Sequence, residues 1–244
     1  CLCRDESQGV TLAPAFVDYE FAGRKEHCLC TATGSARRVM LVPPLFDEMN
    51  RMRKMLVDVM RSLESLAIAS FLPDLPGTNE SLVALEKVSL SDWREALQAC
   101  AEQNEISHVA SFRGGALAIA GMPAARHWIF TPAKGATILR TMMRTRVAAD
   151  RETGLSTSLA ELTAQAETGS LELAGNILGS DLFAQLNAAD IPEMDNQRIV
   201  RLKSDSKPAD CHIPGSALWL RAEPDDDSDM SSSIASDIAG WMGQ

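Results

Sequence analysis

The sequence predicts an α/β fold with a mostly parallel sheet and helices on both faces. Short apolar runs alternate with amphipathic stretches along the chain, as is typical of strand–helix–strand units. In the segment 106–121, ISHVASFRGGALAIAG, an apolar run stops at two glycines and a small-residue helix begins. Because ligands of such sheets bind outside the carboxyl ends of the strands, this turn is the first candidate for a site.

The first strands predict an antiparallel edge to the sheet. Residues 15–21 and 26–33 flank Ala22-Gly23-Arg24-Lys25, a composition that favours a hairpin with glycine in the turn. A buried strand at 39–42 follows, and it ends at Pro43-Pro44 because proline cannot continue a sheet ladder.

Two amphipathic helices are expected next. Asp47 is the predicted N-cap of the first, and its apolar residues recur at three- and four-residue spacing. We interpret its methionines as core packing. A strand at 66–72 ends in a loop rich in proline and glycine, and Ser89 with Asp92 predicts a capping box that begins the second helix.

The second half of the chain contains a long insertion. Residues 133–190 predict mainly helices, and we expect them to form a cap over the carboxyl edge of the sheet. The core is then 1–132 together with 191–244. We expect its last two strands at 198–202 and 217–221, followed by an acidic loop and a final helix.

The turn after the strand in 106–121 matches the architecture of a nucleophile elbow, written Gly-x-Ser-x-Gly in α/β hydrolases. Its five positions here are Ser111, Phe112, Arg113, Gly114 and Gly115. The sequence therefore predicts an α/β-hydrolase fold with arginine at the nucleophile position. A guanidinium cannot be acylated, so the usual covalent chemistry is lost.

The remaining members of a Ser-His-Asp triad are incomplete as well. Asp205 suits the acid position after the penultimate strand, but the catalytic histidine should follow the last strand. The loop that follows the strand expected at 217–221 contains no histidine. The four histidines of the chain lie elsewhere: His27, His108, His127 and His212.

A charged arginine at the first turn of a helix opposes the helix dipole, so Arg113 requires an anion. An internal carboxylate is the favoured partner, from Asp47, Glu48, Asp205 or Glu223; the alternative is an external anionic ligand, such as an acidic sugar or a peptide carboxylate. The expected binding cleft is formed by Pro44, Leu45, Glu48, Arg113, Gly114 and Glu223. Neither a metal nor a cofactor is expected.

The charge and hydropathy of the chain exclude several classes of binding partner. A formal charge of −10 argues against nonspecific nucleic-acid binding and against an anionic membrane surface. No apolar run approaches the roughly 18 residues of a membrane span. Cys1/Cys3 and Cys28/Cys30 form two Cys-x-Cys pairs, for which metal binding, a disulfide or lipid modification of Cys1 are alternatives. We interpret the cysteines as buried thiols of a cytoplasmic protein. What precedes Cys1 is left open.

Several segments resemble one bacterial family. VPPLFDEMNR (42–51), FLPDLPGTNES (71–81), SFRGG (111–115) and SLELAGNILGSDLFAQL (170–186) are similar to the second of two α/β-hydrolase-like proteins associated with exosortase A systems. Asn79 and Glu80 depart from the glycine and aspartate expected there. The resemblance implies a role in exopolysaccharide production and in the sorting of surface proteins with a C-terminal signal, but it supplies no reaction.

Two classes of function remain open from the sequence. The favoured one is a hydrolase-fold protein without a working triad that binds a ligand or partner in the former active-site cleft. The alternative is an active hydrolase of an ester, thioester or acyl-glycan substrate with a non-standard catalytic set.

Overall fold

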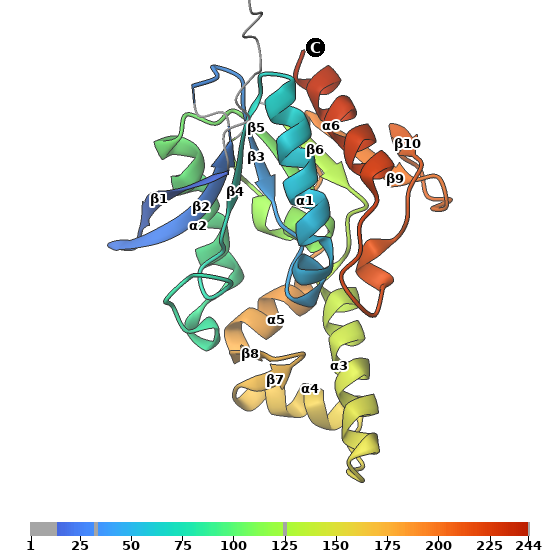
Figure 1. The fold of residues 1–244 in the computed structure, drawn as a ribbon. Coiled ribbons are helices and arrows are strands. Elements are labelled where there is room, and N and C mark those ends of the chain that lie inside the picture. The colour runs from blue at the N-terminus through green and yellow to red at the C-terminus, as the bar shows by residue number, and fades with distance from the viewer. Residues whose placement is uncertain (1–13, 32–33, 124–125, 244) are drawn as a thin grey trace, which may run out of the picture.

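The computed structural model describes residues 14–31, 34–123 and 126–243, which form one large sheet with helices on both faces (Figure 1). The sheet order is β1-β2-β4-β3-β5-β6-β9-β10. The strands of this sheet are β1 (Ala15–Phe21), β2 (Arg24–Thr31), β3 (Arg38–Val42), β4 (Ala69–Pro73), β5 (His108–Phe112), β6 (Arg126–Phe130), β9 (Gln197–Leu202) and β10 (Cys211–Ile213).

All neighbours from β4 to β10 are parallel, whereas β1 pairs with β2 and β2 with β4 antiparallel. The predicted mostly parallel sheet with an N-terminal antiparallel hairpin is thus confirmed. Both antiparallel connections involve the edge hairpin, so the carboxyl ends of β3, β5 and β6 share one edge of the sheet.

Helices cover both faces of the sheet. The α-helices are α1 (Asp47–Ser65), α2 (Leu90–Gln103), α3 (Gly135–Glu152), α4 (Leu159–Thr168), α5 (Ser180–Ala188) and α6 (Ser228–Met242). Short 3-10 helices are η1 (Leu85–Lys87), η2 (Arg113–Ile119) and η3 (Leu218–Leu220). Helices α1 and α6 lie side by side on one face, and α2 packs against η2 and β1 on the other (Figure 1).

Alternation along the strands divides the core in two. Val39 and Leu41 of β3 pack with α1 and α6, whereas Met40 and Val42 pack with α2. The methionine stripe of α1 is buried, which confirms its interpretation as core packing. The capping box of α2 is also confirmed, because the Ser89 hydroxyl accepts from the Asp92 N–H while the Asp92 carboxylate accepts from Ser89 N–H.

The prediction of the last strand was wrong. The final strand is β10, and the apolar run at 217–221 forms η3 instead. Pro214 and Gly215 follow β10 and end it. The run is apolar for a different reason: Leu218 enters the core, and the ring of Trp219 packs on Phe130 and Arg113.

The expected N-cap at Asp47 was also wrong. Phe46 occupies the cap position with φ 57° and makes no side-chain capping bond. Asp47 is the first helical residue, and its carboxylate instead pairs with Arg51 one turn along at 2.8 Å.

Residues 133–190 form a group that lies apart from the sheet, beyond the carboxyl ends of the strands (Figure 1). The group contains α3, α4, α5 and a two-stranded hairpin of β7 (Leu171–Leu173) and β8 (Asn176–Leu178), which the sequence pattern did not indicate. Its two ends meet where the Gly135 N–H donates to the Ala189 carbonyl. Its action as a cap stays a prediction.

We predict that Gly115→Ala lowers the free energy of unfolding by about 1–3 kcal/mol, because a methyl group there would overlap the backbone carbonyl oxygens of Pro43 and Val42. Gly240→Ala is the matched control, since its position in α6 is exposed and open; it should raise stability by about 0.4–1 kcal/mol. Urea unfolding measures both. Equal stabilities for the two variants would contradict the close approach at Gly115.

Candidate functional site

Arg113 occupies the turn at the carboxyl end of β5. It is the first residue of η2 and has φ 56°, in the left-handed region. The expected turn between a parallel strand and a helix is confirmed, although the helix is of the 3-10 type, and its apex residue has a strained backbone. The small residues that follow allow η2 to pack tightly, with Gly115 against the β3 loop.

The guanidinium of Arg113 is held by contacts on several sides. Nε donates to Glu48 Oε2 at 3.1 Å and Nη2 donates to Oε1 at 3.0 Å, a bidentate geometry. Nη1 donates to the Thr131 carbonyl at 2.9 Å. The guanidinium carbon lies 4.2 Å from the centre of the Trp219 ring, which adds a cation–π contact.

The ion pair is largely shielded from water. The side chains of Arg113 and Glu48 are 14% and 13% exposed. The internal carboxylate expected for Arg113 is therefore present, and it comes from Glu48. That residue lies in the first turn of α1, where the helix dipole also favours a negative charge.

A second layer of contacts holds this cluster. Arg51 donates to the Trp219 carbonyl at 2.9 Å while it pairs with Asp47. The loop after β10 is thus tied to α1, and the Trp219 ring is kept over the guanidinium of Arg113.

Three non-glycine residues with positive φ follow neighbouring strands. They are Phe46 after β3 (φ 57°), Arg113 after β5 (φ 56°) and Thr131 after β6 (φ 41°). Left-handed geometry costs such residues of order 1–3 kcal/mol each and persists only where the surroundings enforce it. Backbone strain of this kind clusters at functional sites, so this edge of the sheet is the candidate site.

Asp205 and Glu223 do not join the cluster. Asp205 accepts a hydrogen bond from Arg201 at 2.8 Å and caps the N–H of Lys207, so the acid expected for a triad is used within its own turn. Glu223 is exposed. Neither residue contacts Arg113.

No histidine follows β10 within residues 214–243. His212, expected to precede the last strand, lies within β10, and its Nε2 bonds to the Lys207 carbonyl. His27 pairs with Asp18, and His108 bonds to Ser107. His127 is buried within β6, and this burial lowers its pKa.

Ser111 is fully buried in β5, and its hydroxyl has no hydrogen-bond partner among the described residues. A serine nucleophile needs a base within hydrogen-bond reach, so this geometry does not activate Ser111. The residue acts here as a small side chain beneath the turn.

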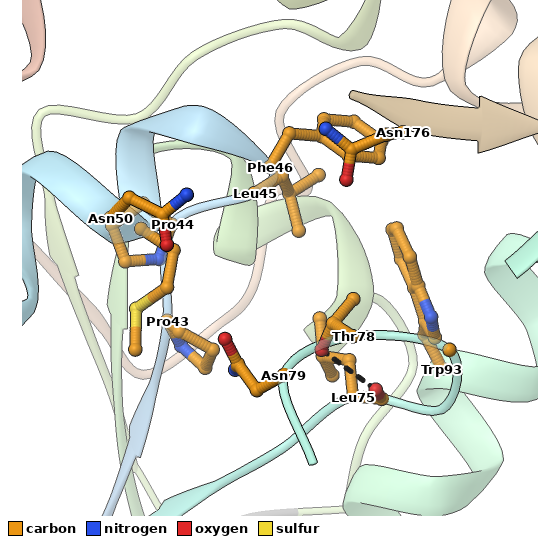
Figure 2. A pocket seen from close by; sticks show the side chains of 12 residues that line it. Pro43, Pro44, Leu45, Phe46, Asn50, Leu75, Thr78, Asn79, Trp93 and Asn176 are labelled. Carbon is orange, nitrogen blue, oxygen red and sulfur yellow. Dashed lines mark hydrogen bonds between the residues drawn. The ribbon is translucent and has the colours of Figure 1, made fainter. Parts of the chain in front are cut away.

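A pocket of about 270 Å³ opens at the same edge of the sheet (Figure 2). Pro44 and Leu45 belong to its wall, which is formed by Pro43, Pro44, Leu45, Phe46, Met49, Asn50, Leu75, Gly77, Thr78, Asn79, Trp93 and Asn176. Gly114 lies behind that wall, where an added methyl group would meet Leu45 and Ile138. Arg113 and Glu48 do not line the pocket.

The polar groups in this pocket are uncharged. Asn50 comes from α1, Thr78 and Asn79 from the loop after β4, and Asn176 from β8 in the segment 133–190. The Asn79 amide donates to Asp74 at 2.8 Å, which fixes its orientation. In Figure 2 the side chains of Asn50, Asn79 and Asn176 surround the opening, and Trp93 forms a flat wall.

Sequence reasoning missed Thr131 and Trp219 as partners of Arg113. Thr131 contributes only a backbone carbonyl, for which no side-chain pattern exists. Trp219 lay in a run that was interpreted as a strand. A tryptophan shortly after the last strand was the one available signal.

The cysteines and the possible metal ligands add no second centre within the described ranges. Cys28, Cys30 and Cys100 are buried free thiols and Cys211 is half-buried, whereas Cys1 and Cys3 lie outside the described residues. No group of three or more described His, Cys, Asp or Glu side chains could hold a metal ion. In the described part of the chain, no helix has the length and apolar character needed to cross a membrane.

No family model matches the chain, and no curated protein matches it significantly in sequence. Solved structures do match. Est1E from Butyrivibrio proteoclasticus with bound ferulic acid has 12% identity and a TM-score of 0.61 over 93% of this chain and 100% of that one. A thioesterase domain from the curacin biosynthetic pathway has 11% identity and a TM-score of 0.56 over 96% and 100%. The bottromycin epimerase BotH in complex with bottromycin A2 has 13% identity and a TM-score of 0.54 over 93% and 99%.

These similarities, with the mostly parallel sheet and its covering helices, define the chain as an α/β-hydrolase-fold protein. Within that fold it carries Arg113 at the turn after β5.

We predict that Arg113→Ser lowers the free energy of unfolding by about 1–3 kcal/mol, because it leaves the half-buried Glu48 carboxylate unpaired. Glu48→Gln should lower it similarly, and the double variant should show a coupling of about 0.5–3 kcal/mol. Chemical denaturation of the four proteins gives these values. Lys134→Ser, which removes the exposed pair with Asp190, is the control and should show no measurable change. Additive effects of the two substitutions would show that the pair does not stabilise the fold.

Proposed function

We propose that this chain is a non-catalytic α/β-hydrolase-fold protein that binds a neutral polar ligand beside its former active centre. The observation that carries this proposal is the bidentate Arg113–Glu48 pair at the nucleophile position. Arg113 offers no nucleophile. Its charge is paired with Glu48, three of its five N–H groups donate to Glu48 and Thr131, and Trp219 covers one face, so it is not a free anion site.

The ligand chemistry follows from the pocket in Figure 2. Three asparagines and one threonine line the wall, while no lysine or arginine does. The Thr78 hydroxyl donates to the Leu75 carbonyl, and the amide NH2 groups of Asn79 and Asn176 donate to Asp74 and to the Leu173 and Ala174 carbonyls. The Asn50 amide and the Asn176 amide oxygen remain for a ligand. Such groups suit a ligand with several hydroxyl or amide groups and no net charge, such as a neutral sugar. The anionic ligand that was the alternative partner of Arg113 is disfavoured here, because Glu48 already occupies that arginine.

In this proposal the segment 133–190 acts as a cap over the pocket. Asn176 of β8 reaches the pocket, and Ile138 of α3 lies against Gly114. A ligand in the pocket would therefore contact both the sheet edge and the cap segment. Closure of such segments commonly controls access to sites of this fold.

The fold alone does not decide between binding and catalysis. The similar structures are Est1E with bound ferulic acid, a thioesterase domain and an epimerase. Different chemistries on one architecture mean that this site must be judged from its own residues.

We place the protein in a bacterial exosortase and exopolysaccharide system, in a reducing cytoplasmic compartment. The resemblance of residues 42–51 and 170–186 supports this setting, and the buried free thiols suit the compartment. A neutral ligand site is compatible with a role that senses or presents a saccharide unit.

For catalysis, we predict that a fluorophosphonate probe labels no serine of the chain, because Ser111 is buried and no described histidine lies beside it. Arg113→Ser should gain no esterase activity on p-nitrophenyl acetate, since no histidine follows β10. Mass spectrometry and absorbance measure these outcomes, with an active serine esterase as positive control. Stoichiometric labelling, or turnover by either protein, would support the alternative of an active hydrolase.

For binding, we predict that neutral oligosaccharides prepared from the exopolysaccharide of an exosortase-bearing bacterium bind this chain and quench its tryptophan fluorescence through Trp93. Asn50→Leu should weaken binding about tenfold or more, because it removes a polar side chain of the pocket wall that makes no hydrogen bond within the described chain. Ile177→Ala, at an exposed residue outside the pocket wall, is the control. Equal affinity of both variants would show that the saccharide does not bind in this pocket. Absence of binding to the unsubstituted protein would refute the saccharide ligand.

A further inference from the structure

A second pocket lies between the β1–β2 turn and the loop that leads from β4 to α2. It has a volume of about 440 Å³ and shares no lining residue with the pocket beside Arg113. Its wall is formed by Phe21, Ala22, Arg24, Glu26, Pro76, Leu82, Val83, Ala84, Lys87, Val88 and Asp92. The proposed function uses none of these residues.

The inner wall carries a buried carboxylate. Glu26 of β2 is only 1% exposed, and its Oε2 has no hydrogen-bond partner among the described residues. Burial raises the pKa of Glu26, although a hydrogen bond with Ser81 acts in the opposite direction. Oε2 is therefore the unused oxygen of the Glu26 carboxylate, and Oε1 is the one that remains for Ser81.

A second acid adds negative potential at the same end. Asp74 is 7% exposed, and its Oδ2 also lacks a partner within the described chain. The Asp74 N–H donates to the carbonyl of His27, the neighbour of Glu26, and the negative charge of Asp74 contributes to the raised pKa of Glu26. A cation that pairs with an unused carboxylate oxygen would stabilise the charged acid against the cost of its burial. Arg24 and Lys87 also line this pocket, but neither forms an ion pair with Glu26.

The outer part of the pocket is apolar. Leu82 is 97% exposed, and Phe21 and Val83 lie partly buried in the same wall. The Ser81 hydroxyl accepts the N–H groups of Gly77 and Val83, which fixes the loop that carries Leu82. Leu82, Val83 and Phe21 together give this pocket an apolar rim next to the buried carboxylate of its inner wall.

We propose that this pocket binds a primary ammonium group attached to an apolar body. The ammonium pairs with Glu26, and the apolar body covers Leu82 and Val83. An ammonium fits better than a guanidinium, because it is a point donor and only one Glu26 oxygen is unused, whereas the guanidinium fork needs two. No set of three described ligand side chains is available for a metal ion. A free amine and the N-terminus of a peptide present the same ammonium chemistry, and the test distinguishes these two sources.

The test compares phenethylammonium chloride with its uncharged isostere 2-phenylethanol by isothermal titration calorimetry on the whole chain. We expect the ammonium to bind about tenfold or more tightly than the alcohol, in line with a charge-assisted hydrogen bond. Glu26→Gln should remove this preference, whereas Leu82→Ser should weaken both ligands by a similar factor. Glu20→Gln is the control, because it makes the same charge change on an exposed residue of the same hairpin.

Two further measurements complete the test. On the unsubstituted protein, phenethylammonium should shift the methyl resonances of Leu82 and Val83 and leave those of Ile177, near the other pocket, unchanged. This readout does not depend on the folding of Glu26→Gln. Leucylglycinamide carries a free N-terminus and its N-acetylated form does not, so this pair tests whether a peptide is the source of the ammonium. Tighter binding of leucylglycinamide than of phenethylammonium assigns the site to peptides. Equal binding of ammonium and alcohol, or an unchanged preference in Glu26→Gln, would overturn the proposal.

Discussion

The Arg113–Glu48 ion pair is the interaction on which the candidate site, at the carboxyl edge of the sheet, depends. It joins the turn after β5 to the first turn of α1, two elements 65 residues apart in sequence. The pair is set among left-handed residues after β3, β5 and β6. Because such backbone geometry is unfavourable in isolation, the contacts of the guanidinium are part of what holds these three turns.

The same pair occupies a turn that keeps the geometry of a nucleophile elbow. The tight turn requires Gly115, whose missing side chain allows η2 to approach the β3 loop. At the apex the guanidinium reaches across to Glu48 and Thr131, and the tryptophan of η3 lies over it. Architecture and reactivity are thus separable in this fold: the first depends on backbone packing and the second on a few side chains.

The sequence was sufficient for the features that depend on local patterns. Alternation predicted the sheet, the capping box at Ser89 was correct, and the need of Arg113 for an anion led to four carboxylates that included Glu48. Prediction from the sequence failed where the same residue pattern arises from different structures. The run at 217–221 has the composition of a strand, but its apolar residues serve a core contact and a cation–π contact in η3. Asp47 has the composition of an N-cap, yet Phe46 takes that position because the turn after Pro43-Pro44 brings it there. Of the pocket beside Arg113, the sequence indicated only Pro44 and Leu45, because the rest of its wall comes from segments that are distant in sequence. The second pocket was not predicted, for the same reason.

The meeting of the two ends of the segment 133–190 has a consequence for the variation of this architecture. The Gly135 N–H and the Ala189 carbonyl are in contact, so the path from β6 to β9 is already closed at the base of the insertion. The entropy of closing a loop rises only slowly with its length, so a closed base permits changes in the length of the outer part of the segment at little cost. Inner residues such as Ile138 and Leu186 share a core cluster with α2 and are constrained by it. Variation during evolution is therefore expected at the end of the segment that lies farthest from the sheet.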